Sequence, residues 1–308
     1  MNHPKINNAD QSERKRPNKP TYVMSLLKML YTILAILFPF SILAQQNIFD
    51  VHLHGDSNPR TQLNALSNAG VYKIAVSTSW DLQQQYIDIN NVKVLRGLMV
   101  PCPNGKVPYS LQPCFQNGEE WPPLDWVEKQ IKSGKINFIG EVLSQYHGIS
   151  SSNTMLLPYY RLAKKYNIPV GIHTGSAGPD HGCPNFQEEL GNPSLMENLL
   201  KQVPGLRLWI MHAGAPYHEE AIRIMKQFPN VYTDLSAINN PSILPHEQFG
   251  AVVKRFVDNG LIDRLMFGSD NGEINGTVNS ITQLSFLTED QKKKILYLNA
   301  ERFFQETK

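Results

Sequence analysis

Two histidines separated by one residue are the first chemical signal in this 308-residue chain. His52 and His54 lie in Phe49–Asp56, FDVHLHGD, and Ile48–His54 has the apolar, β-favouring composition of a buried strand. Alternate residues of a strand point to the same face, so both imidazoles project together. Neutral imidazole is the commonest metal ligand in proteins. An isolated pair could equally bond to backbone or water, so a metal site needs support from elsewhere in the chain.

That support comes from polar residues that follow other apolar runs. They are Glu141 in IGEV, His173 in GIHTG, His212 in IMHAG and Asp270 in FGSDNG. Each alone has an ordinary explanation, since a buried histidine is often hydrogen-bonded and Asp270 could cap a helix. With His52 and His54 they form a set of four imidazoles and two carboxylates, which suits one or two divalent ions, Zn²⁺ or alternatively Mn²⁺.

Strand-like and helix-like segments alternate through residues 45–308. The expected strands are Ile48–His54, Val71–Thr78, Val92–Val100, Ile136–Val142, Ile168–His173, Leu206–His212, Val231–Leu235 and Arg264–Phe267. The expected helices are Thr61–Ala69, Leu82–Ile89, Leu124–Ser133, Met155–Tyr166, Ser194–Val203, Glu219–Phe228, Glu247–Asn259 and Glu289–Phe304. The last begins with a capping box at Thr288 and Gln291.

This alternation predicts an α/β fold, a (β/α)8 TIM barrel, as a single domain over residues 45–308. The candidate ligands stand at the C-terminal ends of their strands, which meet on one rim of a barrel and build its active site. The alternative is an open doubly wound sheet. The chain has no glycine-rich phosphate-binding motif that a nucleotide-binding version would need.

Residues 1–44 are expected to be an N-terminal extension and signal peptide. Residues 1–28 are polar and basic, Met29–Leu43 is apolar, and cleavage is expected after Ala44. The apolar run is short for a membrane span and contains Pro39. The mature protein is therefore expected in the periplasm or outside the cell, without a stable membrane span; the alternative is an uncleaved N-terminal membrane anchor.

Net charge and cysteine content bear on the expected partners and on a possible disulfide. Residues 1–44 carry six basic and two acidic side chains, so the net charge of +2 becomes about −2 once they are removed. Nucleic acid is thus not a favoured partner, whereas a small-molecule substrate is. Cys102 and Cys114 could form a disulfide in an oxidising compartment, and Cys183 would remain. Oligomeric state stays open.

The order H-x-H, acid, His, His, Asp on successive strands resembles the amidohydrolase superfamily. The likeness covers 48–304 and includes NIPVGIHTG, WIMHAG, MFGSD and the closing LNAERFF, typical of the amidohydrolase-related (amidohydrolase 2) branch. The resemblance implies that His52, His54 and Asp270 hold one metal, that His173 and His212 hold a second, and that Glu141 bridges them. Many relatives carry a carboxylated lysine where Glu141 stands; a glutamate there is similar to TatD-type deoxyribonucleases and some phosphotriesterase relatives.

This resemblance implies a metal-dependent hydrolase that cleaves a C–N, C–O or P–O bond of a small molecule with an activated water. Asp270 would accept the proton of that water and return it to the leaving group. One alternative is a metal-dependent decarboxylase of the same branch, with a single ion; another is a non-catalytic exported metal- or ligand-binding barrel. Loop residues expected to contact the substrate are Trp80, His147, His181 and Tyr217, with Tyr146 and His218 nearby in sequence.

Overall fold

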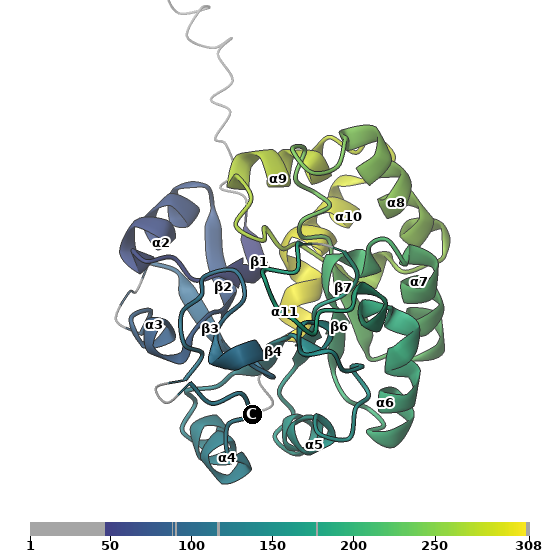
Figure 1. The fold of residues 1–308 in the computed structure, drawn as a ribbon. Helices are drawn as coiled ribbons and strands as arrows, with labels where there is room; N and C mark the ends of the chain where they lie inside the picture. The colour runs from purple at the N-terminus through teal and green to yellow at the C-terminus, as the bar shows by residue number, and fades with distance from the viewer. Residues whose placement is uncertain (1–46, 88, 90, 116–117, 177, 306–308) are drawn as a thin grey trace, which may run out of the picture. The chain divides into compact units, whose positions relative to one another are not determined.

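The computed structural model describes residues 47–305 except 88, 90, 116–117 and 177. The expected signal peptide and its cleavage after Ala44 lie outside the described residues. Eight parallel strands follow one another around a sheet in sequence order (Figure 1). They are β1 (Ile48–His54), β2 (Val71–Ser77), β3 (Lys93–Leu98), β4 (Phe138–Val142), β5 (Val170–Ile172), β6 (Leu208–Ile210), β7 (Val231–Asp234) and β8 (Leu265–Met266).

Hydrogen bonds between the first and last strands bring the two edges of the sheet together. The backbone N–H of Val51 donates to the carbonyl of Phe267 at 3.0 Å, and the N–H of Asp270 donates to the carbonyl of His52 at 2.8 Å. Together with the pairing of β1 through β8, these bonds make the fold a (β/α)8 barrel. This confirms the fold class and the eight strands; β1 has the predicted bounds, and the other strands are shorter than predicted.

The helices between β1 and β8 lie around the outside of the barrel, whereas the last helical segment packs against its N-terminal end (Figure 1). The helices are α2 (Pro59–Asn68), α3 (Trp80–Gln84), α4 (Leu124–Lys132), α5 (Leu157–Lys165), α6 (Met196–Gln202), α7 (His218–Gln227), α8 (His246–Asp258), α9 (Ile274–Thr282), α10 (Glu289–Lys293) and α11 (Asn299–Phe303). The predicted capping box is present, since the Thr288 side chain accepts from the N–H of Gln291 and the Gln291 side chain accepts from the N–H of Thr288. A π-helical turn, Lys294–Leu298, joins α10 to α11.

Two helices differ from the sequence prediction. Helix α9 was not expected, because its sequence INGTVNSIT contains one glycine, two asparagines and five β-branched residues, all weak helix formers. The Glu273 carboxylate caps it by accepting from the N–H groups of Asn275 and Gly276. Helix α3 begins at Trp80, before the expected Leu82, and is short.

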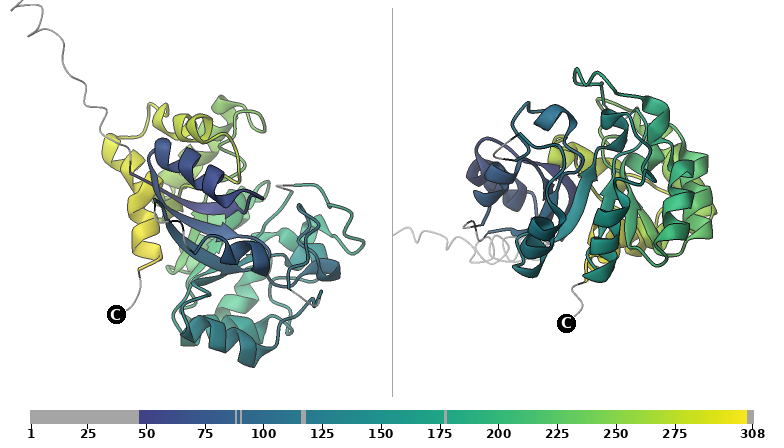
Figure 2. Two further views of the ribbon diagram at one scale, coloured as in Figure 1. Left: turned by 90° about the vertical axis from the view of Figure 1, so that its left-hand side faces the viewer. Right: turned by 60° about the horizontal axis from the view of Figure 1, so that its bottom comes forward.

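Aromatic side chains fill the barrel interior and its N-terminal end. Phe49, Phe138 and Trp209 point inward from the strands and pack with Phe303 and Phe304 from the C-terminal segment. The left view of Figure 2 shows the yellow C-terminal helices at the end of the barrel opposite the teal loops. The six candidate metal ligands lie at the opposite, C-terminal end of the strands. Within the described part of the chain, no helix is both long and apolar enough to span a bilayer.

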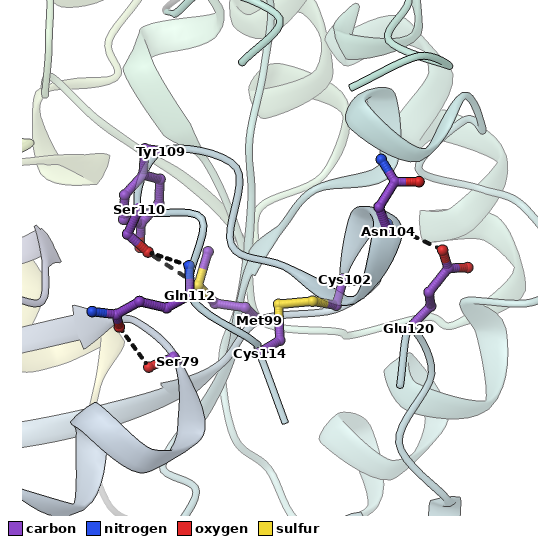
Figure 3. The surroundings of a disulfide bond; sticks show 9 residues. All are labelled: Ser79, Met99, Cys102, Asn104, Tyr109, Ser110, Gln112, Cys114 and Glu120. Carbon is purple, nitrogen blue, oxygen red and sulfur yellow. Dashed lines mark hydrogen bonds between the residues drawn. A yellow bond between two sulfur atoms is a disulfide. The ribbon is translucent and has the colours of Figure 1, made fainter. Parts of the chain in front are cut away.

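The loop between β3 and α4 contains a disulfide. Cys102 and Cys114 are bonded, with their Cα atoms 6.1 Å apart, and both are buried (Figure 3). The third cysteine, Cys183, is buried and free. The Cys102–Cys114 disulfide, which the sequence only allowed, is therefore present. This bond closes a loop that lies beside the C-terminal rim.

Candidate metal centre at the C-terminal rim

The six side chains predicted as ligands lie together at the C-terminal ends of the strands. His54 Nε2 is 2.8 Å from Asp270 Oδ1, which joins the end of β1 to the turn after β8. His52 Nε2 lies 3.8 Å from Asp270 Oδ1 and 3.9 Å from Glu141 Oε2. On the other side, Glu141 is hydrogen-bonded to Nδ1 of His173. The same His173 nitrogen is 3.3 Å from His212 Nε2.

Two groups of ligand atoms are close enough to hold an ion. One consists of His52, His54 and Asp270, and the other of His52, Glu141 and His212; within each, the ligand atoms lie within 4.8 Å of one another. His173 belongs to neither group among the described residues, since its Nδ1 pairs with Glu141 and its Nε2 is 3.5 Å from the Tyr146 hydroxyl. A ligand role for His173 stays a prediction.

Asp234, at the end of β7, contacts two of these histidines. It was not identified from the sequence. Its Oδ2 lies 3.2 Å from His52 Nδ1 and accepts from the indole N–H of Trp209 at 3.1 Å. Its Oδ1 accepts from the backbone N–H of His212 at 3.0 Å and from the Ser236 hydroxyl at 2.6 Å. The sequence signal that could have identified Asp234 is its carboxylate at the end of a predicted strand, because the other site residues also stand at strand ends.

Ser236 completes this support. Its hydroxyl is 3.0 Å from Nδ1 of His52 and 3.0 Å from Nδ1 of His212. Because the Nδ1 atoms are held on this side, the Nε2 atoms of both histidines face the cluster. Orienting a ligating histidine through its second nitrogen is a common feature of metal sites.

The backbone at two site residues is unusual. His212 has φ of 58° and Asp270 has φ of 50°, in the left-handed region that non-glycine residues rarely adopt. Each such conformation costs on the order of 1–3 kcal/mol and is maintained by the surrounding structure. The hydrogen bonds from His212 to Asp234 and from Asp270 to the His52 carbonyl hold these conformations in place.

Burial and neighbouring charges raise the pKa of some groups in the cluster and lower that of others. Burial by itself lowers the pKa of His52, but the carboxylates of Asp234, Asp270 and Glu141 together outweigh it and raise that pKa to about 10. Burial lowers the pKa of His212 to about 4, with the nearby His52 and His173 acting in the same direction. Burial would raise the pKa of Asp270, but the hydrogen bond from His54 and the adjacent imidazoles hold it well below its usual range. The metal-free site therefore combines anionic carboxylates, a protonated His52 and a neutral His212.

Two buried atoms in the cluster fit a cation. His52 Nε2 and Glu141 Oε2 have no hydrogen-bond partner among the described residues. Leaving such atoms unpaired costs about 1–3 kcal/mol each, more where charge is involved. A divalent ion between them would remove this cost, and imidazole with carboxylate is the ligand set that Zn²⁺ and Mn²⁺ accept. The residues present therefore fit a bound metal.

The cluster opens into a cavity of about 340 Å³. Of the residues predicted to contact substrate, His181 lines it, as does the neighbouring Tyr146. The remaining lining residues are His54, Gly55, Pro108, Tyr109, Glu141, Leu143, His173, Gly178, Pro179, His212, Asp270 and Asn271. Tyr109 was not identified from the sequence, because nothing there showed that the loop after β3 turns back over β1.

The other three residues predicted to contact substrate are not among the described residues that line the cavity. Trp80 packs on Trp126, with ring centroids 4.7 Å apart, and so supports the outer packing. His147 packs on Trp121 at 5.3 Å. Tyr217 precedes α7, and the nearby His218 starts that helix, with its Nδ1 2.9 Å from the Ala213 carbonyl.

The chain matches a known protein family over more than half of its length. The family model described as Amidohydrolase matches residues 124–305, which include β4 through β8 and four of the six clustered residues. A search of curated proteins found no match.

Solved structures with the same fold include proteins of different activity. An uncharacterized TIM-barrel protein from Bordetella bronchiseptica is similar with a TM-score of 0.59 and 18% identity, covering 83% of this chain and 98% of that one. A probable 2-pyrone-4,6-dicarboxylic acid hydrolase from Acinetobacter baumannii has a TM-score of 0.56 and 13% identity, covering 84% and 99%. A 2,6-dihydroxybenzoate decarboxylase from Rhizobium has a TM-score of 0.55 and 12% identity, covering 84% and 98%. At these identities the likeness establishes the fold.

Proposed function

The chain belongs to the amidohydrolase family, and we propose that it is a metal-dependent hydrolase that cleaves a C–N, C–O or P–O bond of a small molecule. The observation that carries this proposal is the arrangement of His52, His54 and Asp270, whose ligand atoms lie within 4.8 Å of one another beside a cavity that His54 and Asp270 line. A divalent ion, Zn²⁺ or Mn²⁺, would be held by these residues and by Glu141 and His212. When bound, such an ion lowers the pKa of water towards neutrality and polarises the bond under attack.

Asp270 is the residue proposed to move the proton. Its carboxylate borders the cavity, and its side chain is 17% exposed, whereas His52 is completely buried. Its depressed pKa keeps it ionised at neutral pH and so able to accept a proton. It would take the proton from the attacking water and return it to the leaving group.

The cavity walls supply the remaining contacts. A cavity of about 340 Å³ is in the range of small-molecule sites, which supports a small-molecule substrate. The Tyr146 hydroxyl faces His173, and burial raises the pKa of this tyrosine well above its ordinary value, so it stays a donor. Tyr146 and His181 are placed to hydrogen-bond a polar substrate group.

One feature favours a second candidate, a metal-dependent decarboxylase. His52 Nε2 belongs to both possible ion-holding groups, and one imidazole nitrogen has one lone pair to give. This arrangement supports a single ion, whereas the two-ion hydrolase would need His173 to leave its hydrogen bond with Glu141. The fold is shared with a 2,6-dihydroxybenzoate decarboxylase as well as with a probable hydrolase.

The test is metal analysis of purified protein combined with activity screening before and after chelation. Panels of esters, lactones, amides and phosphodiesters should show turnover that chelation abolishes and a divalent ion restores. Release of carbon dioxide from aromatic carboxylates, with one ion per chain, would instead favour the decarboxylase. A metal-loaded protein with no turnover on either panel would contradict both and favour a binding barrel.

We also propose that the protein is exported and lacks its first 44 residues when mature. The basic segment followed by apolar Met29–Leu43 supports this. The Cys102–Cys114 bond supports it independently, because disulfides persist mainly in oxidising compartments. Intact mass of the protein from a native fractionation should correspond to a chain that begins at Gln45; a full-length chain in the membrane fraction would contradict it.

A further inference from the structure

The ring of His54 is held differently from the other three histidines of the cluster. His52 and His212 have Nδ1 beside Ser236, and His173 has both ring nitrogens beside polar partners, Glu141 and Tyr146. In contrast, Nδ1 of His54 is buried and has no hydrogen-bond partner within the described part of the chain. No hydrogen bond on that side therefore sets the orientation of the ring.

The backbone of His54 is fixed nonetheless. Its N–H donates to the Asn271 side chain at 3.0 Å, and its carbonyl accepts from the Gln62 side chain at 2.9 Å. What these bonds leave free is rotation of the side chain. On the other side of the ring, Nε2 of His54 lies 2.8 Å from Asp270 Oδ1 and is restrained by that hydrogen bond, but a bound cation would take the place of this bond.

Tyr109 provides the missing support through its ring. The Tyr109 and His54 rings lie with centroids 4.0 Å apart and planes inclined by 47°. Both residues line the cavity, so this ring contact lies at the cavity wall. An aromatic contact of this kind restricts the imidazole to rotamers in which Nε2 points to Asp270.

Tyr109 is itself anchored to the end of β2. Its hydroxyl donates to the carbonyl of Ser77 at 2.9 Å. Burial, with the negative charges of Glu141 and Asp270, raises its pKa well above the ordinary value. The hydrogen bond to Ser77 therefore fixes the outer end of the tyrosine side chain.

The segment that carries Tyr109 is the loop closed by the disulfide (Figure 3). Inside it, the N–H of Val107 donates to the carbonyl of Gln112 at 2.8 Å. The Gln112 side chain accepts from the Ser79 hydroxyl at 3.0 Å, which ties the loop to the segment after β2. The Cys102–Cys114 bond holds the two ends of the loop together, so the position of Tyr109 depends on it.

We propose that Tyr109 is a positioning residue that fixes the His54 imidazole for metal binding, and that the disulfide-closed loop, residues 102–114, holds Tyr109 in place. The part of this proposal that concerns metal rests on the proposed function. The orientation of the His54 ring does not, because it is a property of the metal-free protein.

The test compares Tyr109→Leu and Tyr109→Phe with the wild-type protein in two measurements. The first is the long-range ¹H–¹⁵N spectrum of the histidine rings in metal-free protein, with His54 assigned from a His54→Asn variant. The second is Co²⁺ titration followed by visible absorption. Tyr109→Leu should shift or broaden the His54 ring signals and weaken Co²⁺ binding roughly three- to tenfold, whereas Tyr109→Phe, which keeps the ring, should retain most of the affinity.

The controls separate positioning from general stability. Tyr166→Leu removes a half-buried tyrosine that follows α5 and hydrogen-bonds to Glu128 of α4, away from the cavity lining. It should leave both measurements unchanged. Tyr109→Met serves as a second variant should Tyr109→Leu be insoluble, with the same expected result. Unchanged His54 signals and unchanged Co²⁺ affinity in a folded Tyr109→Leu protein would overturn the role of Tyr109.

The loop is tested with a Cys102→Ser/Cys114→Ser double variant. It should change the His54 signals in the same direction as Tyr109→Leu, and wild-type signals in this variant would overturn the role of the disulfide. If the wild-type protein binds no Co²⁺, the proposed function fails, while the His54 ring signals still decide the positioning role.

Discussion

The Asp234 carboxylate lies 3.2 Å from Nδ1 of His52 and at the same time accepts the backbone N–H of His212 at 3.0 Å. One side chain at the end of β7 thus orients a histidine of β1 and the backbone of His212, which lies two residues after β6. Both bonds are buried. The two histidines lie 160 residues apart in sequence, and their relative position depends on Asp234 and Ser236 rather than on contact with each other alone.

Replacing Asp234 should therefore weaken metal binding without removing any ligand. Asp234→Asn keeps the shape but loses the charge, and we expect about 10- to 100-fold weaker binding of a divalent ion, the usual effect of losing a hydrogen-bond partner of a ligand. Competition with a chromophoric chelator measures the affinity. Asp258→Asn is the control, because Asp258 is exposed and pairs only with Lys254 among the interactions described. Wild-type affinity in Asp234→Asn would contradict the role of this residue.

Metal binding should release protons at neutral and mildly alkaline pH. Because the pKa of His52 is raised to about 10 in the metal-free protein, this histidine carries a proton that an ion must displace. Calorimetric titration at pH 8 in buffers of different ionisation enthalpy should give about one proton released per ion. The number should fall as pH approaches 10 and in Asp234→Asn. A binding enthalpy independent of the buffer at pH 8 would contradict the protonation of His52.

The stability of the metal-free protein should decrease as pH falls from about 6.5 to 4 because of His212. Its folded-state pKa of about 4 lies below the unfolded value, so in this window the unfolded chain binds more protons. The contribution of His212 is present above pH 6.5 and lost towards pH 4, on the order of 3 kcal/mol. Urea unfolding across this range, compared with His212→Gln, measures it. The variant should show a shallower pH dependence, and identical slopes would refute the assignment.

Asp270→Asn should separate catalysis from metal binding. His52 and His54 remain as ligands, so metal content should be largely preserved. Loss of the proton acceptor should lower turnover about 10²- to 10⁴-fold. Asp263→Asn, in an exposed pair with Lys294, is the control. Full activity in Asp270→Asn would refute its role as the base.

The disulfide should stabilise the fold whether or not a metal is bound. Under denaturing, non-reducing conditions, the chain should titrate one thiol, from Cys183, out of three cysteines. Cys102→Ser/Cys114→Ser should lower the free energy of unfolding by about 3 kcal/mol, the value expected for a loop of this length. Three titratable thiols in the oxidised protein would show that the bond does not form.

The barrel and the cluster were accessible from sequence because both follow from simple periodicities. Strands such as Phe138–Val142 are apolar runs of the right length, and the residue at the end of each run points to the common rim. For this reason His52, His54 and Asp270 could be placed together although they are far apart in the chain. Their shared position at strand ends was sufficient to predict that they lie close together.

The supporting residues were not accessible in the same way. Asp234 stands at a strand end but offers no spacing motif, so its role depends on the distances to His52 and His212. Tyr109 reaches the site through a loop closed by a disulfide, which the sequence left open, and is held by a bond to Ser77, which has no local sequence signature. Trp80 and His147 were expected at the substrate but pack on Trp126 and Trp121, because an aromatic side chain after a strand can turn outward as readily as inward.

The central claim is that side chains from β1, β4 and the turns after β6 and β8 bind a divalent ion at one rim of the barrel. The most direct measurement is the metal content of purified wild-type protein and of a His52→Ala/His54→Ala double variant, by mass spectrometry after equilibrium dialysis against Zn²⁺ or Mn²⁺. We predict at least one ion per chain in the wild type and the loss of at least one in the variant. Equal metal content in the two proteins, or none in the wild type, would contradict the account.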